Sequence, residues 1–500
     1  MRAKRCHPEA ADRFRHALLT VAQMAQADQR TIASGVPGPE LMEAAGAAVA
    51  QAIRQRWAPL TTLVLCGPGN NGGDGFVIAR LLAAVGWPVR LALMGDRAAI
   101  RGDAAVHAAL WEGAVGSIET CDLEGVSLVV DALFGAGLSR QIDGAAASIL
   151  ADVAARAIPV VAVDTPSGVH GETGADWGAI KAALTVTFAR AKPGHLLLPG
   201  RKLCGELVIA AIGISDDTIA ALEPLTARND PALWRDVFPR LDPEGHKYGR
   251  GHALIIGGWP MSGAARLGAR AALRCGAGLV SVAVPPEAFA VYAGALEAVM
   301  VKTVASDEDI AGLLGDIRHN ALLIGPGAGL GPTTRERALG VLRADRATIL
   351  DADALTTLAT APDGFRDAMA ARVSGCPVIL TPHEGEFRRL FPMAGDKLTR
   401  AREAACVSGT IIVLKGADTV IAAPDGRAVI NDNAPPTLAT AGSGDVLAGI
   451  ILGLIAQGMP GFEAACAGVW LHGAAASGFG PGLIAEDLPD QLPRVLRGLL

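Results

Sequence analysis

The sequence has few aromatic residues and no motif of closely paired cysteines. Only 4% of its 500 residues are aromatic, whereas Gly is abundant at 61 residues, a composition that suits close packing of helices on a sheet and glycine-rich ligand loops. The eight cysteines are scattered, with no C-x-x-C pair. A disulfide framework and a zinc site are therefore disfavoured, and a reducing compartment is favoured.

Long apolar and long basic runs are also missing. The most apolar run, residues 446–456, falls well short of the ~20 residues that a membrane span needs. The N-terminal segment turns polar too soon to be a signal peptide. The net charge of -6 without a basic run argues against nucleic acid as a partner. We therefore expect a soluble cytoplasmic protein that binds neither a membrane nor nucleic acid.

The length indicates two domains, because 500 residues exceed one ordinary hydrophobic core. Residues 216–243 carry Pro224, Pro231, Pro239 and Pro243 and interrupt the pattern on either side. The loop motifs of the two halves differ, so the halves are not an internal repeat. The predicted domains are residues 1–228 and 229–500.

Each half alternates short apolar runs with helical segments, the pattern of a parallel sheet with helices on both faces. A helix is expected at 39–53, and the strands of the first half are expected at 62–67, 89–94, 128–133, 160–164, 184–188 and 207–210. Those of the second half are expected at 253–257, 279–284, 321–324, 347–351, 378–381 and 410–415, followed by a hairpin of 419–422 and 427–430. The predicted class is α/β with two doubly wound domains, the first a Rossmann-like three-layer sandwich.

Three polar loops follow strands of the first half, at 66–75, 131–141 and 164–168. Ligands of doubly wound folds bind beyond the carboxyl ends of the strands, so these loops should meet over one crevice. Gly67-x-Gly-x-x-Gly together with Asp96 also matches the dinucleotide fingerprint, which makes an NAD-dependent dehydrogenase domain a rival interpretation.

Polar side chains in these loops count against that rival. Asn70, Asn71 and Asp74 occupy a loop where a pyrophosphate cradle uses mostly backbone. Asp131 and Asp164 add two carboxylates, and close carboxylates need a cation or a shared proton. A metal ion, proton transfer or both are therefore expected, although each Asp alone is typical of a cap or turn.

The second half contains Gly442-Ser-Gly-Asp445 between a polar loop and an apolar segment. Amides that open a helix after glycines can seat phosphate oxygens, and Asp445, which the helix dipole keeps ionised, can take a proton from a hydroxyl. This combination suits phosphoryl transfer to an alcohol. The same residues also fit an ordinary helix entry capped by Ser443 or Asp445.

Other catalytic motifs are excluded. His383-Glu384 begins like a zinc motif, but Phe387 stands where H-E-x-x-H requires its second histidine. Neither the P-loop motif nor G-x-S-x-G occurs.

The motifs at 27–32, 38–46, 69–75 and 163–168 resemble the NAD(P)H-hydrate epimerase family over about residues 15–225, with Thr165 in place of the family's usual Ile. The resemblance implies a hydrated nicotinamide nucleotide held by Asp164 and two loops: Asn70, Asn71, Gly72, Gly73 and Asp74, then Gly135, Ala136, Gly137, Leu138, Ser139, Arg140 and Gln141. It also implies a potassium ion held by Asn71, Asp131 and Ser167. Asp164 would act in proton transfer during inversion at ring carbon 6, assisted by Lys192.

The motifs at 246–252, 262–267, 275–280, 381–387 and 438–447 resemble the ADP-dependent NAD(P)H-hydrate dehydratase family, which has a ribokinase-like fold, from about residue 230 onward. The resemblance implies that the hydrated nucleotide contacts Ala264, Gly327, His383 and Asp445, the last as catalytic base. It implies that ADP or ATP contacts Lys415, Gly416, Ala417, Asp418, Thr419 and Gly444, with magnesium on its phosphates.

The chain as a whole resembles the fused bifunctional NAD(P)H-hydrate repair enzymes. The resemblance implies that the first domain interconverts the R and S hydrates and the second dehydrates the S form at the expense of ADP. We also expect a homo-oligomer. Two rival interpretations stay open, namely a small-molecule kinase whose product remains phosphorylated and a first domain that binds a nucleotide or partner without chemistry.

Overall fold

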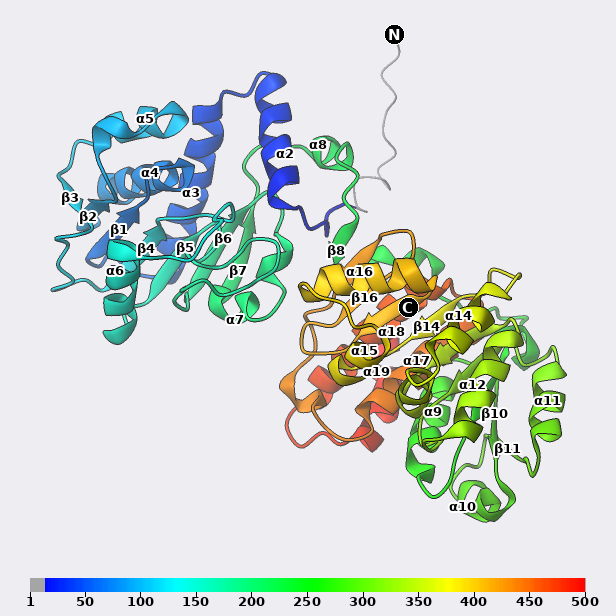
Figure 1. The fold of residues 1–500 in the computed structure, drawn as a ribbon. Coiled ribbons are helices and arrows are strands. Elements are labelled where there is room, and N and C mark those ends of the chain that lie inside the picture. The colour runs from blue at the N-terminus through cyan, green and yellow to red at the C-terminus, as the bar shows by residue number, and fades with distance from the viewer. Residues whose placement is uncertain (1–13, 500) are drawn as a thin grey trace, which may run out of the picture. The chain divides into compact units, whose positions relative to one another are not determined.

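The computed structural model describes residues 14–499, so Cys6 and the first 13 residues of the N-terminal segment considered as a signal peptide lie outside the described residues. The chain divides into two compact units, Met1–Ala227 and Arg228–Leu500 (Figure 1). None of the helices in residues 14–499 combines the length and the apolar character that crossing a bilayer requires.

The first unit is built on a parallel sheet of seven strands in the order β3-β2-β1-β4-β5-β6-β7. The strands are β1 (Thr62–Cys66), β2 (Val89–Leu93), β3 (Val115–Ser117), β4 (Leu128–Ala132), β5 (Val160–Val163), β6 (Leu184–Phe188) and β7 (Glu206–Ala210). The strand order reverses between β1 and β4, which is where ligands of such sheets bind. The sequence analysis missed β3, a three-residue edge strand without an apolar run.

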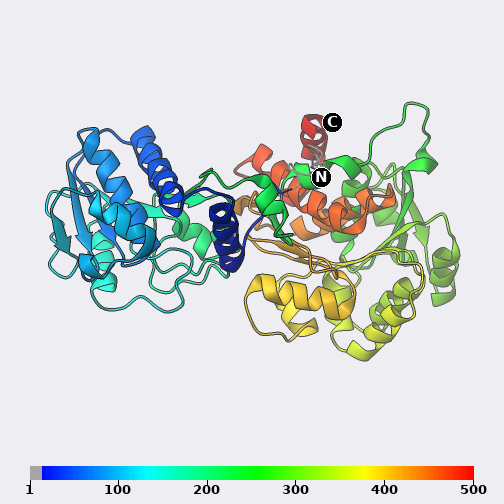
Figure 2. The same ribbon diagram turned by 90° about the horizontal axis from the view of Figure 1, so that it is seen from above.

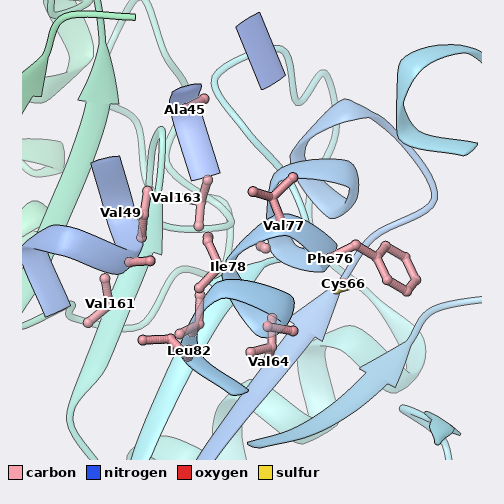
Figure 3. Packing of buried hydrophobic residues seen from close by; sticks show 14 of the residues in the cluster. Ala45, Val49, Val64, Cys66, Phe76, Val77, Ile78, Leu82, Val161 and Val163 are labelled. Carbon is pink, nitrogen blue, oxygen red and sulfur yellow. The ribbon is translucent and has the colours of Figure 1, made fainter. Parts of the chain in front are cut away.

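Helices cover both faces of this sheet. They are α2 (Val21–Ala33), α3 (Gly38–Arg56), α4 (Asn70–Ala84), α5 (Gly102–Ala109), α6 (Gly144–Ala155), α7 (Gly200–Cys204) and α8 (Asp216–Ala220). Val64 and Val161 join one core with Phe76 and Ile78 of α4, and Figure 3 shows these side chains between α4 and the sheet. Leu63 and Leu65 point to the opposite face, because side chains alternate along a strand. There they join a second core that includes Ile149 of α6.

The second unit contains a sheet of ten strands in the order β11-β10-β9-β12-β13-β14-β15-β16-β17-β8. They are β8 (Thr226–Arg228), β9 (His252–Ile256), β10 (Leu279–Val284), β11 (Met300–Thr303), β12 (Ala321–Ile324), β13 (Ala347–Leu350), β14 (Val378–Leu380), β15 (Ile411–Leu414), β16 (Val420–Ala422) and β17 (Ala428–Ile430). Strands β9 to β15 run parallel, and β16 and β17 form the predicted antiparallel hairpin. Both edge strands, β8 and β11, were missed. The predicted α/β class with two doubly wound parallel sheets is confirmed.

Helices again lie on both faces of this sheet (Figure 2). They are α9 (Ser262–Arg274), α10 (Phe289–Ala293), α11 (Asp307–Gly315), α12 (Pro332–Arg343), α13 (Ala352–Leu358), α14 (Pro362–Ala370), α15 (Glu384–Leu390), α16 (Lys397–Ser408), α17 (Ser443–Ala456), α18 (Gly461–Phe479) and α19 (Leu488–Leu499). Every residue of 446–456 in α17 is buried. A Cβ on Gly449 would lie 2.2 Å from Gly268 O of α9, so the most apolar run of the chain is a tightly packed core helix.

Candidate active sites

The three polar loops of the first unit line one cavity of about 420 Å³. It opens beyond the carboxyl ends of β1, β4 and β5, as the loop positions predict. Its lining includes Asp28, Asn70, Asn71, Asp74, Asp103, Gly135, Ala136, Gly137, Asp164 and Lys192.

Asp164 lies directly after β5 with a left-handed backbone (φ 66°), which is uncommon for a residue other than glycine. Its Oδ1 accepts hydrogen bonds from Lys192 Nζ (2.6 Å) and Thr187 Oγ1 (2.9 Å). Its Oδ2 accepts one from the Ala136 amide (2.9 Å). Burial opposes ionisation of this carboxyl, but Lys192 and the other donors outweigh burial and lower its pKa to about 2. Asp164 is therefore a firmly ionised carboxylate with its oxygens engaged.

His195 supports both members of this pair and was missed by the sequence analysis. The Lys192 amide donates to His195 Nδ1 (2.9 Å), so the ring proton is on Nε2, which donates to Asp164 O (2.8 Å). Burial and the nearby Lys192 lower the pKa of His195 to about 4. The neutral His195 ring thus links the backbone of Lys192 to the backbone of Asp164. The only signal in the sequence was a His three residues after Lys192.

The three residues expected to hold potassium carry oxygen donors and lie near each other. Ser167 Oγ and N donate to the buried Asp131 carboxylate (2.6 and 2.8 Å). Burial raises the pKa of Asp131, although the hydrogen bonds from Ser167 lower it in part. Asn71 Nδ2 is buried and has no hydrogen-bond partner among residues 14–499. The Asp131 carboxylate, the Ser167 hydroxyl and the Asn71 side-chain carbonyl are oxygen ligands of the kind such a cation takes, whereas Asn71 Nδ2 is a donor and would need an acceptor.

Several predicted residues lie outside the cavity. Gly72 packs against its own loop, where a Cβ would lie 1.8 Å from Gly67 O, and a Cβ on Gly73 would lie 2.8 Å from Ala104 Cβ. Asp96, which the dehydrogenase interpretation places on a ribose, accepts the Ala98 amide (2.9 Å) as a helix cap. The other predicted substrate contacts that do not line the cavity are Leu138, Ser139, Arg140 and Gln141, and the predicted potassium ligands Asp131 and Ser167 do not line it either.

The second site surrounds the N-terminus of α17. Gly442 has a left-handed backbone (φ 86°), and the helix starts at Ser443 without a side-chain cap. The Ser443 hydroxyl instead donates to Leu438 O (2.9 Å). The interpretation of Ser443 or Asp445 as a cap is therefore wrong. The first-turn amides remain directed at the point where an anion would sit.

Lys415, at the end of β15, lies beside this helix entry. A Cβ on Gly444 would lie 3.3 Å from Lys415 Nζ, and that ammonium donates to the buried Asp351 carboxylate (2.8 Å). Burial raises the pKa of Asp445 to about 7, with Asp351 adding to the shift and Lys415 opposing it. The helix dipole alone predicts the opposite direction, because it favours the ionised form. Burial and the nearby carboxylates outweigh the helix dipole, and the raised pKa gives Asp445 the basicity of a general base near neutral pH.

The loop predicted to bind the adenine nucleotide, residues 415–419, is held by its own hydrogen bonds. Thr419 Oγ1 donates to Gly416 O (2.8 Å) and accepts from the Gly416 amide (3.1 Å). Lys397 of α16 donates to Asp418 (2.6 Å) and was missed, because it is far away in the sequence.

The other predicted contacts of this site also follow strand ends. Ala264 lies in the first turn of α9, and its Cβ would lie 3.4 Å from a Cβ on Gly327, in the loop after β12. The loops after β9 and β12 touch, since a Cβ on Gly258 would lie 2.0 Å from Gly327 O. His383 caps α15, with Nδ1 accepting from the Gly385 amide (2.9 Å). Within residues 14–499 no three His, Cys, Asp or Glu side chains are grouped to hold a metal ion.

Comparison with known proteins covers both units. A family model described as NAD(P)H-hydrate dehydratase matches residues 253–494, and one described as YjeF-related protein N-terminus matches residues 38–194. The bifunctional NAD(P)H-hydrate repair enzyme Nnr of Salinibacter ruber is 38% identical over 96% of this chain and 96% of its own length. The chain belongs to the bifunctional NAD(P)H-hydrate repair enzyme family. The Escherichia coli enzyme of that name is 38% identical over 91% of this chain and 89% of its own length.

Solved structures resemble the separate parts of this NAD(P)H-hydrate repair family member. An ADP/ATP-dependent NAD(P)H-hydrate dehydratase from Bacillus subtilis, co-crystallised with ATP and Mg²⁺, is 32% identical and covers 55% of this chain and 98% of that one (TM-score 0.47). A ribokinase-like superfamily protein from Enterococcus faecalis is 25% identical and covers 53% of this chain and 95% of that one (TM-score 0.47).

Proposed function

We propose that this chain repairs hydrated NADH and NADPH, with an epimerase in residues 1–228 and an ADP-dependent dehydratase in residues 229–500. The observation that carries the proposal is the 38% identity to a bifunctional repair enzyme along 96% of both chains. Because the similarity spans both units, it supports both activities in one polypeptide.

In the dehydratase, Asp445 accepts the proton of the hydroxyl on ring carbon 6. The hydroxyl oxygen then bonds to the terminal phosphorus of ADP, and AMP leaves. Phosphate, a better leaving group than hydroxide, departs from carbon 6, and loss of a proton from carbon 5 restores the dihydropyridine ring. The products are NAD(P)H, AMP and phosphate. A pKa of about 7 supports Asp445 as the base, since it is ionised in part at neutral pH and basic enough to take the proton.

The adenine nucleotide binds the 415–419 loop and the start of α17 in this proposal. Lys415 Nζ lies beside Gly444, which supports contact of both residues with the phosphates. Magnesium bound to the nucleotide would neutralise phosphate charge during transfer. The substrate side is formed by Ala264, Gly327 and His383.

In the epimerase, the Asp164–Lys192 pair acts at ring carbon 6 of the substrate. The hydrogen bonds of Asp164 to Lys192 and Ala136 hold its charge inside the cavity. Potassium held by Asn71, Asp131 and Ser167 supplies a positive charge beside the cavity when bound. Only one epimer presents its hydroxyl to a fixed Asp445, so inversion by the first domain delivers the other epimer to the second.

The deciding experiment gives the protein both hydrate epimers, magnesium and ADP or ATP, and follows the absorbance of reduced nicotinamide. We expect both epimers to be converted with release of phosphate. A phosphorylated alcohol as the final product favours the kinase interpretation. Consumption of one epimer only, with the other bound but unchanged, favours a first domain without chemistry. Homo-oligomerisation and a cytoplasmic location stay predictions.

A further inference from the structure

One carboxyl group in the first cavity has no role in the proposed function. Asp28 lies on α2, a helix whose N-terminus is closed by a capping box of Thr20 and Gln23. Ala27, next to it, is fully buried in a core that includes Ile219 of α8. Arg30 also ties α2 to that region through a hydrogen bond to Ala221 O (2.9 Å). Asp28 is therefore presented to the cavity by a helix anchored on both sides of it.

The surroundings of Asp28 differ from those of Asp164. Within residues 14–499 its carboxyl has no hydrogen bond and no ion pair, whereas Asp164 accepts from three donors. Burial raises the pKa of Asp28 to about 6, lowered in part by Lys192 and raised by Asp164. The other charged groups that line the cavity come from different elements, Asp74 of α4 and Asp103 of α5. Burial, Asp164 and Asp28 raise the pKa of Asp74 well above its usual range, which favours its neutral form, whereas Asp28 can exchange a proton near neutral pH and Asp164 stays ionised.

We propose that Asp28 is a second catalytic residue of the epimerase, the one that gives a proton to the departing hydroxyl and takes one from the incoming water. This inference rests on the proposed epimerase function. The carboxyl proton moves to the hydroxyl on carbon 6, the carbon–oxygen bond breaks, and water leaves as the ring nitrogen lone pair forms a double bond to carbon 6. Water then adds to the opposite face of carbon 6, the double-bond electrons return to nitrogen, and the surplus proton of the water returns to carboxylate. No oxidation or reduction occurs.

In this proposal the role expected for Asp164 from the resemblance changes from proton transfer to that of a carboxylate that stays ionised. The ring is positively charged after water leaves, and a fixed carboxylate in a buried site stabilises that charge. An Asp164 of pKa about 2 keeps its charge throughout, whereas Asp28 moves the proton.

The test measures epimer interconversion by the full-length protein without nucleotide, so that the second site is idle. We expect Asp28→Asn to lower kcat by about 100-fold or more with KM changed little, as for loss of an acid–base group. Asp28→Glu should recover much of the rate. The control is Asp96→Asn, which changes a carboxylate outside the cavity at a position where Asn can still accept the Ala98 amide, and it should stay within about threefold of the wild type.

The pH profile separates catalysis from a structural role. Wild-type kcat should fall above the pKa of Asp28, about 6, because the protonated form is the acid, and Asp28→Asn should lose this limb. If Asp28→Asn is unstable, Asp28→Glu decides, since its limb must move with the new carboxyl. A wild-type rate in Asp28→Asn or an unchanged limb in either variant overturns the inference, and so does a raised KM with unchanged kcat in Asp28→Asn. If the wild type itself interconverts nothing, the proposed function fails instead.

Discussion

Each unit places an aspartate and a lysine at its site, yet the two pairs have opposite electrostatics. In the first unit Lys192 donates directly to Asp164 (2.6 Å), and the pKa of Asp164 is about 2. In the second unit Lys415 donates to Asp351 (2.8 Å), and Asp445 has a pKa of about 7. The same residue types therefore give a permanent charge in one site and a neutral-pH base in the other. The reason is that Lys192 pairs with Asp164 itself, whereas Lys415 pairs with Asp351 and not with Asp445.

The difference explains how one chain can carry two chemistries on similar sheets. A carboxylate held as a charge stabilises a positive ring, and a carboxylate with raised pKa removes a proton from an alcohol. Burial favours the neutral form of both aspartates, so burial cannot cause the difference between their pKa values. The position of the ammonium causes it.

The largest expected effect is at the neutral-pH base. Asp445→Asn should lower nucleotide-dependent dehydration by about 10²–10⁴-fold, because the amide cannot accept the hydroxyl proton. The side chain is not a helix cap, so the fold should be retained. The measurement is kcat for recovery of NAD(P)H from the favoured epimer. Epimer interconversion in the same variant is the control and should be unchanged. Dehydration at near the wild-type rate would remove Asp445 from the mechanism.

Removing the permanent charge should have the next largest effect. Asp164→Ala should bind the hydrated nucleotide but lose epimer interconversion by about 100-fold or more, because Lys192 is left without its partner and the cavity without its fixed charge. Chromatography of an epimer mixture with excess nucleotide should show one epimer consumed and the other left, apart from slow spontaneous inversion. Loss of both epimers at the wild-type rate contradicts a catalytic Asp164.

The effect of Lys415 on the pKa of Asp445 can be tested by removing the carboxylate of Asp351, with which Lys415 pairs. Wild-type dehydration should rise with pH and level off above about 7, because the ionised form of Asp445 is the base. Asp351→Asn removes the largest carboxylate contribution to the raised pKa of Asp445 and releases Lys415. The rising limb of kcat should then move to lower pH. Asp353→Asn is the matched control and should move it less. A limb that stays in place would show that Lys415 does not control Asp445.

Separation of the two units should have the smallest effect on activity. Residues 1–228 and 229–500 should each fold and retain their own reaction within about twofold, because each contains its own core and site. The second fragment loses β8 from the edge of its sheet, so we expect a lower Tm for it. The measurement compares epimer interconversion by the first fragment and dehydration by the second fragment with the same two rates of the full chain. An inactive second fragment beside an active full chain would show that the sites depend on each other.

The sequence by itself determined the α/β class, most strands and the placement of polar loops at strand ends. These features are local, since apolar alternation, glycine and proline act within a few residues. Strands β3, β8 and β11 were not predicted because edge strands of three or four residues have little buried apolar pattern. Motif residues such as Asp164 and Asp445 were likewise readable, because their neighbours in sequence form the loop.

Only the tertiary structure decided which carboxylate each lysine meets and what each aspartate can therefore do. Lys415 and Asp351 are 64 residues apart, and Lys192 and Asp164 are 28 apart, so no local pattern reports the pairing. Asp28 belongs to the 27–32 motif, but only the packing of α2 places it in the cavity lining, half-buried, near Asp164 and Lys192. A pKa depends on burial and on all charges within several ångströms, and folding sets both.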